Sequence, residues 1–187
     1  MEDIKNIDLP LEEADILSLR AGDRVMLSGI LYTGRDKAHA RMIEALNAGE
    51  PLPVDLSGQM IYYAGPTPTK TGQIIGSIGP TTSSRMDAFS PQLMAQAGLK
   101  GTLGKGPRSQ EVIKAMVEYQ GIYMVAIGGT GALISQAVKK VEVVAYADLG
   151  TEAIRRLEVE NLPAIVAIDC QGNNLLEEGR LAYQEKS

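Results

Sequence analysis

The sequence is poor in residues that bind metals, with one cysteine, Cys170, and one histidine, His39, among 187 residues. A single cysteine cannot form a disulfide within the chain, and an iron–sulfur cluster takes three or four thiolates. An ordinary Cys/His zinc site is excluded for the same reason. Any metal that this protein uses therefore has to arrive on a partner. Cys170 ends a predicted strand, and we expect its thiol to be inert.

Other scarcities exclude further classes of protein. There is no Trp and one Phe, so aromatic platforms for stacked bases are few. The net charge of -5, from 18 basic and 23 acidic residues, argues against nucleic acid as the main partner. No stretch approaches the roughly 20 apolar residues that span a bilayer, and the charged segment MEDIKNIDLP lacks an apolar secretory core. We therefore expect a cytoplasmic protein with no nucleic-acid or membrane partner.

Size and periodicity predict an α/β fold. The 187 residues, 44% of them hydrophobic, suffice for one well-filled domain spanning 1–187. Strands alternate with helices in the second half, which predicts three layers with some parallel pairing. The first half has longer connections and a Pro-rich linker at 50–53, which favours a mixed sheet.

The individual elements follow from apolar spacing, glycines and caps. Asp36 and Ser109 are placed to cap helices. Residues 157–160 fit either the end of a helix or the start of a strand. Strands are expected at 24–32, 59–64, 74–78, 99–103, 122–127, 141–147 and 163–169. Helices are expected at 11–19, 37–48, 86–96, 110–119, 132–139 and 151–156, with a frayed helix at 175–187.

The stretch Ile78–Asp87, IGPTTSSRMD, joins a predicted strand to a predicted helix. The first turn of a helix has unpaired N–H groups and a partial positive charge, which favour anions. Four hydroxyl residues add donors, and Arg85 adds a planar fork suited to a carboxylate or phosphate. The alternative is that Ser84 caps the helix and Arg85 is solvated. From this stretch alone, both interpretations stay open.

Three glycine-flanked loops follow predicted strands, and each contains one isolated basic residue: Arg35, Arg85 or Lys105. Ligands of open α/β sheets gather at the carboxyl ends of strands. Each cation taken alone is best explained as a solvated surface residue. Together, beside threonine hydroxyls, they would fit a small dianion such as a dicarboxylic acid.

Three further features point away from other chemistry. The segment GKGPRS at 104–109 lacks the spacing of a nucleotide-binding phosphate loop. The segment GGTG at 128–131 could be a second anion cradle, but close helix–sheet packing explains it more simply. His39 falls one turn inside its helix, where we expect a structural role facing the Arg35 loop.

Longer blocks of the sequence resemble one family, the β-subunit, or C-terminal domain, of class I fumarate hydratases and the related tartrate dehydratases. The resemblance covers essentially the whole chain. RMD together with KGxRS looks like the fumarase branch. The matching blocks are GRDKAHAR at 34–41, AGPTP at 64–68, IGPTTSSRMD at 78–87, GKGPRS at 104–109, IGGTGAL at 127–133 and the closing EVENLPAIVAIDCQGNN.

The resemblance implies a swivelling β/β/α domain that is active only with an α-subunit, in a higher oligomer such as a heterotetramer. That α-subunit is expected to hold a 4Fe–4S cluster through three cysteines, with the fourth iron acting as a Lewis acid on a C4 dicarboxylate substrate. This chain is expected to bind no cluster alone.

Site residues carry over by the same resemblance. Arg35, Arg85 and Lys105 would clamp the substrate carboxylates, and Thr81 would be the base that moves the C3 proton. A threonine hydroxyl is too weakly acidic to ionise near neutrality, so Thr81 needs activation by a neighbour. The residues expected to orient this set from behind are Asp36, Asp87 and Arg108.

The sequence therefore predicts the β-subunit of an iron–sulfur-dependent hydro-lyase that interconverts fumarate and L-malate. One alternative is the β-subunit of an L-tartrate dehydratase. A second, from another class, is a non-catalytic module that binds a small dicarboxylate.

Overall fold

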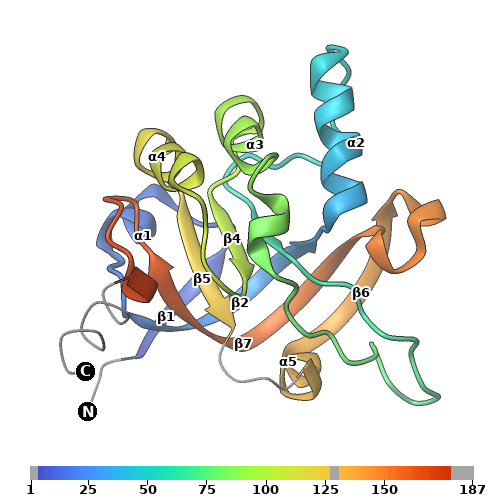
Figure 1. The fold of residues 1–187 in the computed structure, drawn as a ribbon. Coiled ribbons are helices and arrows are strands. Elements are labelled where there is room, and N and C mark those ends of the chain that lie inside the picture. Colours follow the sequence, from blue (N-terminus) through green and yellow to red (C-terminus); the bar gives the residue numbers. More distant parts are fainter. Residues whose placement is uncertain (1–3, 127–130, 178–187) are drawn as a thin grey trace, which may run out of the picture.

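The structure is a computed structural model that describes residues 4–126 and 131–177 (Figure 1). Its strands are β1 (Ile4–Leu9), β2 (Arg24–Thr33), β3 (Met60–Tyr62), β4 (Gly101–Gly104), β5 (Ile122–Ala126), β6 (Val138–Ala145) and β7 (Ile154–Ile168). Its α-helices are α1 (Glu13–Ser18), α2 (Asp36–Asn47), α3 (Ser90–Ala97), α4 (Gln110–Tyr119) and α5 (Gly131–Ala137). Two 3-10 helices complete the elements, η1 (Ser83–Met86) and η2 (Ala147–Glu152).

The strands form a mixed sheet that closes on itself. Their order is β1-β2-β3-β4-β5-β7-β6, and β7 also pairs with β2. The pairs formed among strands β1 to β5 are all parallel. Strand β7 is antiparallel to β2, β5 and β6. The pairing of β7 with both β2 and β5 closes a ring. Because β2, β3 and β4 are parallel neighbours, their carboxyl ends lie side by side on one rim.

Alternation along the strands divides the apolar residues between two cores. Tyr62 faces the core inside the ring, whereas its neighbours Ile61 and Tyr63 face the core beneath the helices. Helices α2, α3 and α4 cover this outer face, on the same side of the sheet in Figure 1. The predicted α/β class with a mixed sheet is confirmed. One core lies inside the ring of strands, and the other lies between the strands and the helices.

The parallel pairing expected in the second half is confirmed for β4 and β5, whereas β6 and β7 in the same half are antiparallel to their neighbours. The helix expected at 151–156 is wrong, because β7 begins at Ile154 and the ambiguous residues 157–160 belong to it. The strand expected at 163–169 starts earlier than predicted. Asn161 adopts a left-handed conformation (φ 53°) within β7 and donates its N–H to Ser28 Oγ (3.0 Å), which ties this position to β2.

Two elements around the central stretch also differ from the prediction. Residues 74–78 form no strand. They fold back against the segment that precedes them, and Thr67 N–H donates to the Ser77 carbonyl (2.9 Å). A Cβ on Gly76 would lie 2.2 Å from the Thr67 carbonyl oxygen, so the approach of the two limbs requires glycine. The helix expected at 86–96 is split into η1 and α3. Pro91 has no N–H to donate, which explains the break.

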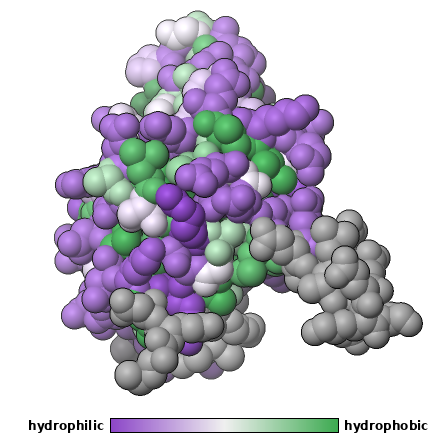
Figure 2. Space-filling view, turned by 90° about the vertical axis from the view of Figure 1, so that its left-hand side faces the viewer, coloured by the Kyte–Doolittle hydropathy of each residue, from purple (hydrophilic) through white to green (hydrophobic). Residues whose placement is uncertain are grey.

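The remaining predictions concern the end of the chain and its surface. Residues 175–177 are helical, and the rest of the expected helix at 175–187 lies outside the described residues, as do residues 128–130 of the GGTG segment. Gly131 packs against the loop Ser77–Gly79, where a Cβ would lie 2.5 Å from Ser77 Oγ. None of the described helices is long and apolar enough to cross a membrane. Figure 2 shows one face of the molecule, on which hydrophilic residues interrupt the hydrophobic areas.

Candidate functional site

The central stretch lies across the carboxyl ends of β3 and β4. Thr81 N–H donates to the carbonyl of Tyr63 (2.6 Å), directly after β3. Thr82 forms an isolated parallel bridge with Lys105, directly after β4. Arg85 follows in η1. The rim that gathers the strand ends therefore also gathers the three segments that carry the predicted cations.

Asp36 connects Arg85 to the segment of Arg35. Arg85 Nε donates to Asp36 Oδ1 (2.9 Å), and the two side chains are 48% and 29% exposed. Asp36 is the first residue of α2 after the N-cap Arg35, and its side chain makes no capping hydrogen bond, so the expected cap is wrong. Asp36 Oδ2 is buried and has no hydrogen-bond partner among the described residues. The carboxylate therefore orients Arg85, as the predicted role requires.

Lys105 has an exposed side chain on a fixed backbone. Its N–H donates to Ser83 Oγ (3.1 Å), and its carbonyl accepts from Ser83 N–H (2.9 Å). A Cβ on Gly104 would lie 2.0 Å from Ser83 Oγ, so this approach requires glycine. The structure thus holds the Arg85 and Lys105 segments against each other. No described residue forms a hydrogen bond or ion pair with the ammonium group of Lys105.

Thr81 is partly exposed and belongs to the same stretch as Arg85. Its backbone is anchored by the Tyr63 carbonyl, but its hydroxyl makes no hydrogen bond within the described part of the chain. No described side chain therefore activates Thr81 as a base. If it acts as one, the activating group has to come from outside these residues.

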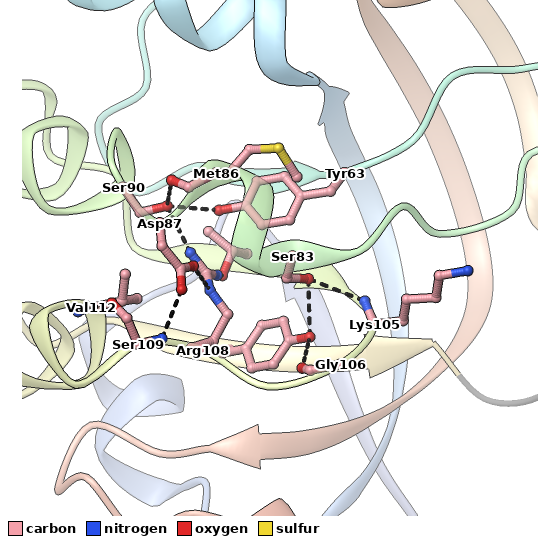
Figure 3. A network of polar contacts seen from close by, with 12 residues as sticks. Tyr63, Ser83, Met86, Asp87, Ser90, Lys105, Gly106, Arg108, Ser109 and Val112 are labelled. Carbon is pink, nitrogen blue, oxygen red and sulfur yellow. Dashed lines mark hydrogen bonds and ion pairs between the residues drawn. The ribbon is translucent and has the colours of Figure 1, made fainter.

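Beneath the rim lies a buried ion pair between Arg108 and Asp87 (Figure 3). Arg108 Nε donates to Asp87 Oδ1 (2.7 Å), and Asp87 Oδ2 accepts from Ser109 N–H (2.7 Å). The guanidinium also donates to Thr102 Oγ1 (3.1 Å) and Ser90 Oγ (2.7 Å). Burial disfavours its charge, but Tyr63 and Asp87 outweigh this effect and raise the pKa of Arg108. The pair joins η1 and α3 to the loop that follows β4, which suits the predicted orienting role.

A second chain of hydrogen bonds fixes the turn at Lys105. Burial raises the pKa of Tyr123 to about 12, so its hydroxyl stays protonated. Tyr123 Oη donates to the Gly106 carbonyl (2.8 Å), and it therefore accepts from Ser83 Oγ (3.0 Å). Ser83 Oγ in turn accepts from Lys105 N–H. The direction of each bond is therefore set. Ser83 holds the N–H of Lys105, and Tyr123 holds the carbonyl of Gly106.

Tyr63 and Ser90 complete the support on the other side of Arg108. Ser90 Oγ donates to the Met86 carbonyl (2.8 Å), so it accepts from the Tyr63 hydroxyl (3.0 Å). The rings of Tyr63 and Tyr123 lie 5.2 and 5.1 Å from the Arg108 guanidinium carbon. Cation–π attraction therefore adds to the hydrogen bonds.

His39 supports the Arg35 loop from below. It is fully buried, and burial, together with the charge of Arg108, lowers its pKa to about 4, so the ring is neutral. Nδ1 lies 2.8 Å from the Arg35 carbonyl, which only accepts, so the proton is on Nδ1. Gly34 passes over the ring, where a Cβ would lie 3.1 Å from Cε1. The structural role expected for His39 is confirmed.

The two serine caps proposed from sequence have opposite outcomes. Ser109 is the N-cap of α4, and its side chain accepts from Val112 N–H (3.4 Å). Ser84 is exposed and caps nothing, because η1 begins at Ser83 with no side-chain cap. The interpretation of Ser84 as a cap is therefore wrong.

The described residues do not fit an iron–sulfur cluster. Cys170 is buried, and its thiol donates to the Ile16 carbonyl (3.5 Å). Within residues 4–126 and 131–177, no group of three or more Cys, His, Asp or Glu is placed to hold a metal ion. We therefore derive no chemical step through a cluster from this chain.

Several residues of the site were missed from the sequence. Glu152 lies 117 positions after Arg35 in the sequence, with Oε1 3.8 Å from Arg35 Nη2. No local pattern indicated this contact, because it depends on the return of the chain from β6 to β7. The buried hydroxyls carried a weak signal, since polar residues within apolar stretches need partners. These residues are Tyr63, Ser83, Ser90 and Tyr123.

Comparison with known proteins identifies the family. The family model described as Fumarase C-terminus matches residues 1–179. The chain is 40% identical over 179 residues to the class I, aerobic fumarate hydratase of Escherichia coli, covering 94% of this chain and 33% of that protein. It is 42% identical over 176 residues to the mitochondrial fumarate hydratase 1 of Leishmania major, covering 92% and 32%.

A third relative has a different length and name. The putative L(+)-tartrate dehydratase subunit beta of Methanocaldococcus jannaschii is 40% identical over 181 residues, covering 94% of this chain and 93% of that protein. The chain thus spans about a third of the length of the fumarate hydratases and nearly all of this subunit. With the family match over residues 1–179, these relatives show that the chain belongs to the fumarase C-terminal family.

Proposed function

We propose that this chain is the β-type part of a hydro-lyase that interconverts fumarate and L-malate. The observation that carries the proposal is the rim at the ends of β2, β3 and β4, where Arg85 and Lys105 are exposed beside Arg35. A C4 dicarboxylate has two anionic ends, and several fixed cations on one rim can bind both. The names of the fumarate hydratase relatives support the same substrate.

In this proposal the cations do more than bind. Removal of the C3 proton from malate places additional negative charge on the adjacent carboxylate. Fixed cations aimed at that charge stabilise the transition state more than the ground state. Asp36 orients Arg85, which reduces the reorganisation needed when the charge develops, and Ser83 holds the backbone of Lys105 beside it. Thr81 is proposed to move the C3 proton.

The partner is proposed to be an α-subunit that holds the 4Fe–4S cluster, within a heteromer. When bound there, the cluster supplies Lewis-acid chemistry to the substrate's hydroxyl and carboxylate. The length of the fumarate hydratase relatives and the subunit name of the Methanocaldococcus relative support a second part. This division also provides a source for the group that activates Thr81.

The second candidate is dehydration of L-tartrate, which the name of the Methanocaldococcus relative favours. Tartrate presents the same two carboxylates and one additional hydroxyl. The cationic rim therefore accepts either acid, and the choice depends on what contacts the second hydroxyl.

The test is anaerobic reconstitution of the chain with its α-subunit, followed by assays with malate, fumarate and L-tartrate. Turnover of malate and fumarate well above that of tartrate supports the proposal. Preferential turnover of tartrate supports the second candidate. Tight dicarboxylate binding by the chain, with turnover of neither acid, would replace both proposals by a non-catalytic binding module.

A further inference from the structure

Two carboxylates of η2 contact α2, from a segment far away in the sequence. Asp148 pairs with Arg41, part-way along α2, with Arg41 Nη1 donating to Asp148 Oδ1 (2.8 Å). Glu152 lies at the start of α2, where its Oε2 accepts from Lys37 N–H (3.0 Å). That N–H is one of the amides that a helix leaves unpaired in its first turn. Glu152 thus anchors the segment that begins with Arg35.

The same carboxylate faces the guanidinium of Arg35. Glu152 Oε1 lies 3.8 Å from Arg35 Nη2, and the two side chains are 16% and 22% exposed. Arg35 Nε is buried and has no hydrogen-bond partner among the described residues. The guanidinium is therefore held near one carboxylate without using all of its donors.

Close packing keeps Arg35 and η2 at the rim. A Cβ on Gly65, just beyond β3, would lie 2.6 Å from the Thr151 carbonyl oxygen and 3.4 Å from Arg35 Nη1. The Arg35 side chain therefore lies between the end of β3 and the end of η2. Arg155 N–H donates to Thr33 Oγ1 (3.1 Å), which joins the start of β7 to the end of β2. The position of Glu152 is thus tied to the end of β2, two residues before Arg35.

We propose that Glu152 is a positioning residue that sets the orientation of Arg35 for one carboxylate of the substrate. The inference rests on the proposed function and adds a residue to its site. Each of the two arginines has its own carboxylate: Glu152 faces Arg35, and Asp36 pairs with Arg85. Without the charge of Glu152, Asp36 is the nearest carboxylate along the chain to Arg35, and it already orients Arg85. Loss of Glu152 therefore misaligns the pair rather than removing a contact with substrate.

The test compares Glu152→Gln with Asp148→Asn in the complex with the α-subunit. Gln keeps an oxygen that accepts from Lys37 N–H, but it loses the charge and places an NH2 group where Oε1 faces Arg35. Asp148→Asn removes the matching η2–α2 ion pair away from the rim. We expect Glu152→Gln to raise the KM for L-malate about three- to five-fold with kcat changed less. The KM of Asp148→Asn should equal that of the wild type. An unchanged KM in Glu152→Gln, or an equal rise in both variants, would overturn the proposal.

A second readout uses the full chain without its partner. The Nε–H signal of Arg35 in a ¹⁵N–¹H spectrum is assigned by its loss in Arg35→Lys. We expect this signal to shift in Glu152→Gln and to stay in place in Asp148→Asn, and no shift in Glu152→Gln contradicts the role. If the wild-type complex fails to turn over malate, the proposed function fails, while the spectrum still decides whether Glu152 positions Arg35.

Discussion

Arg85 lies exposed at the rim, whereas Arg108 lies buried beneath it. The Arg108 side chain is fully buried, and Nε and both Nη atoms donate to Asp87, Thr102 and Ser90. The Arg85 side chain is about half exposed, and within the described part of the chain only its Nε is paired, with Asp36. An arginine has five N–H donors. Arg108 therefore donates from all three of its nitrogens within the fold, whereas the Nη end of Arg85 has no partner among the described residues and is proposed to meet the substrate.

The comparison separates two kinds of cation that have the same charge. Removing a buried arginine leaves its carboxylate partner buried and uncompensated, which destabilises the fold. An exposed cation with few partners contributes little to stability. Arg85 and Lys105 belong to the second kind, and their effect should appear in activity. Each prediction below tests one side of this difference.

The largest effect is expected for Arg108→Met. This variant leaves Asp87 buried and charged without its partner, and we expect the free energy of unfolding to fall by about 3 to 5 kcal/mol. Urea unfolding measures it. Arg85→Met is the matched control and should lose less than about 1 kcal/mol. Equal stability losses in the two variants would break the comparison.

Lys105→Met tests the exposed side. The backbone bonds to Ser83 remain, so we expect unchanged unfolding but a fall in kcat/KM for malate of about 100-fold or more in the complex. Lys114→Met, on the exposed face of α4, controls for the loss of one charge. Wild-type-like turnover of Lys105→Met would contradict a role in the site.

His39 supports the loop of Arg35 through the Arg35 carbonyl, and its signature is a pH dependence. Its pKa is about 4 in the folded chain and about 6.5 when unfolded. Between these values the unfolded chain binds a proton that the folded chain does not. Stability therefore falls as the pH drops from about 6.5 to about 4, by at most about 3 kcal/mol from this group.

The variant His39→Asn keeps a donor for the Arg35 carbonyl and does not titrate. Urea unfolding at a series of pH values from 4 to 8 should show a shallower acid decline in the variant than in the wild type. Parallel curves for the two proteins would show that His39 is not held neutral by burial.

The smallest effect concerns the two serines. Ser109→Ala removes the N-cap of α4, and we expect a loss of about 1 kcal/mol and a fall in Tm of about 2 to 4 °C. Ser84→Ala should leave Tm unchanged, because Ser84 caps no helix. Calorimetry of both variants measures the difference, and a larger loss in Ser84→Ala would restore the interpretation that the structure overturns.

The sequence predicted the elements whose signals are local. The spacing of Val112 and Met116 behind Ser109 predicted α4 with its N-cap, and both are found. The apolar run IYMVA predicted β5. Glycine-flanked basic residues after strands predicted that three loops share one rim, because the ends of adjacent parallel strands meet.

Failures occurred where distant segments decide the structure. Asp36 had the position of a cap, but Arg85 was the stronger partner across the rim. The strand expected from residue 163 starts at Ile154 instead, because residues 157–160 pair with β2 and β6. Glu152 reaches Arg35 only because β7 closes the ring against β2. Such contacts depend on tertiary pairing, which no local pattern encodes.

The most direct test of the central claim is Arg85→Ala, measured for stability and activity together. The chain is reconstituted anaerobically with its α-subunit, and conversion of L-malate to fumarate is followed beside urea unfolding of the same variant. The account predicts a fall in kcat/KM of about 100- to 1,000-fold with a stability change within about 0.5 kcal/mol. Turnover like that of the wild type would show that the exposed cation of this rim does not act on substrate.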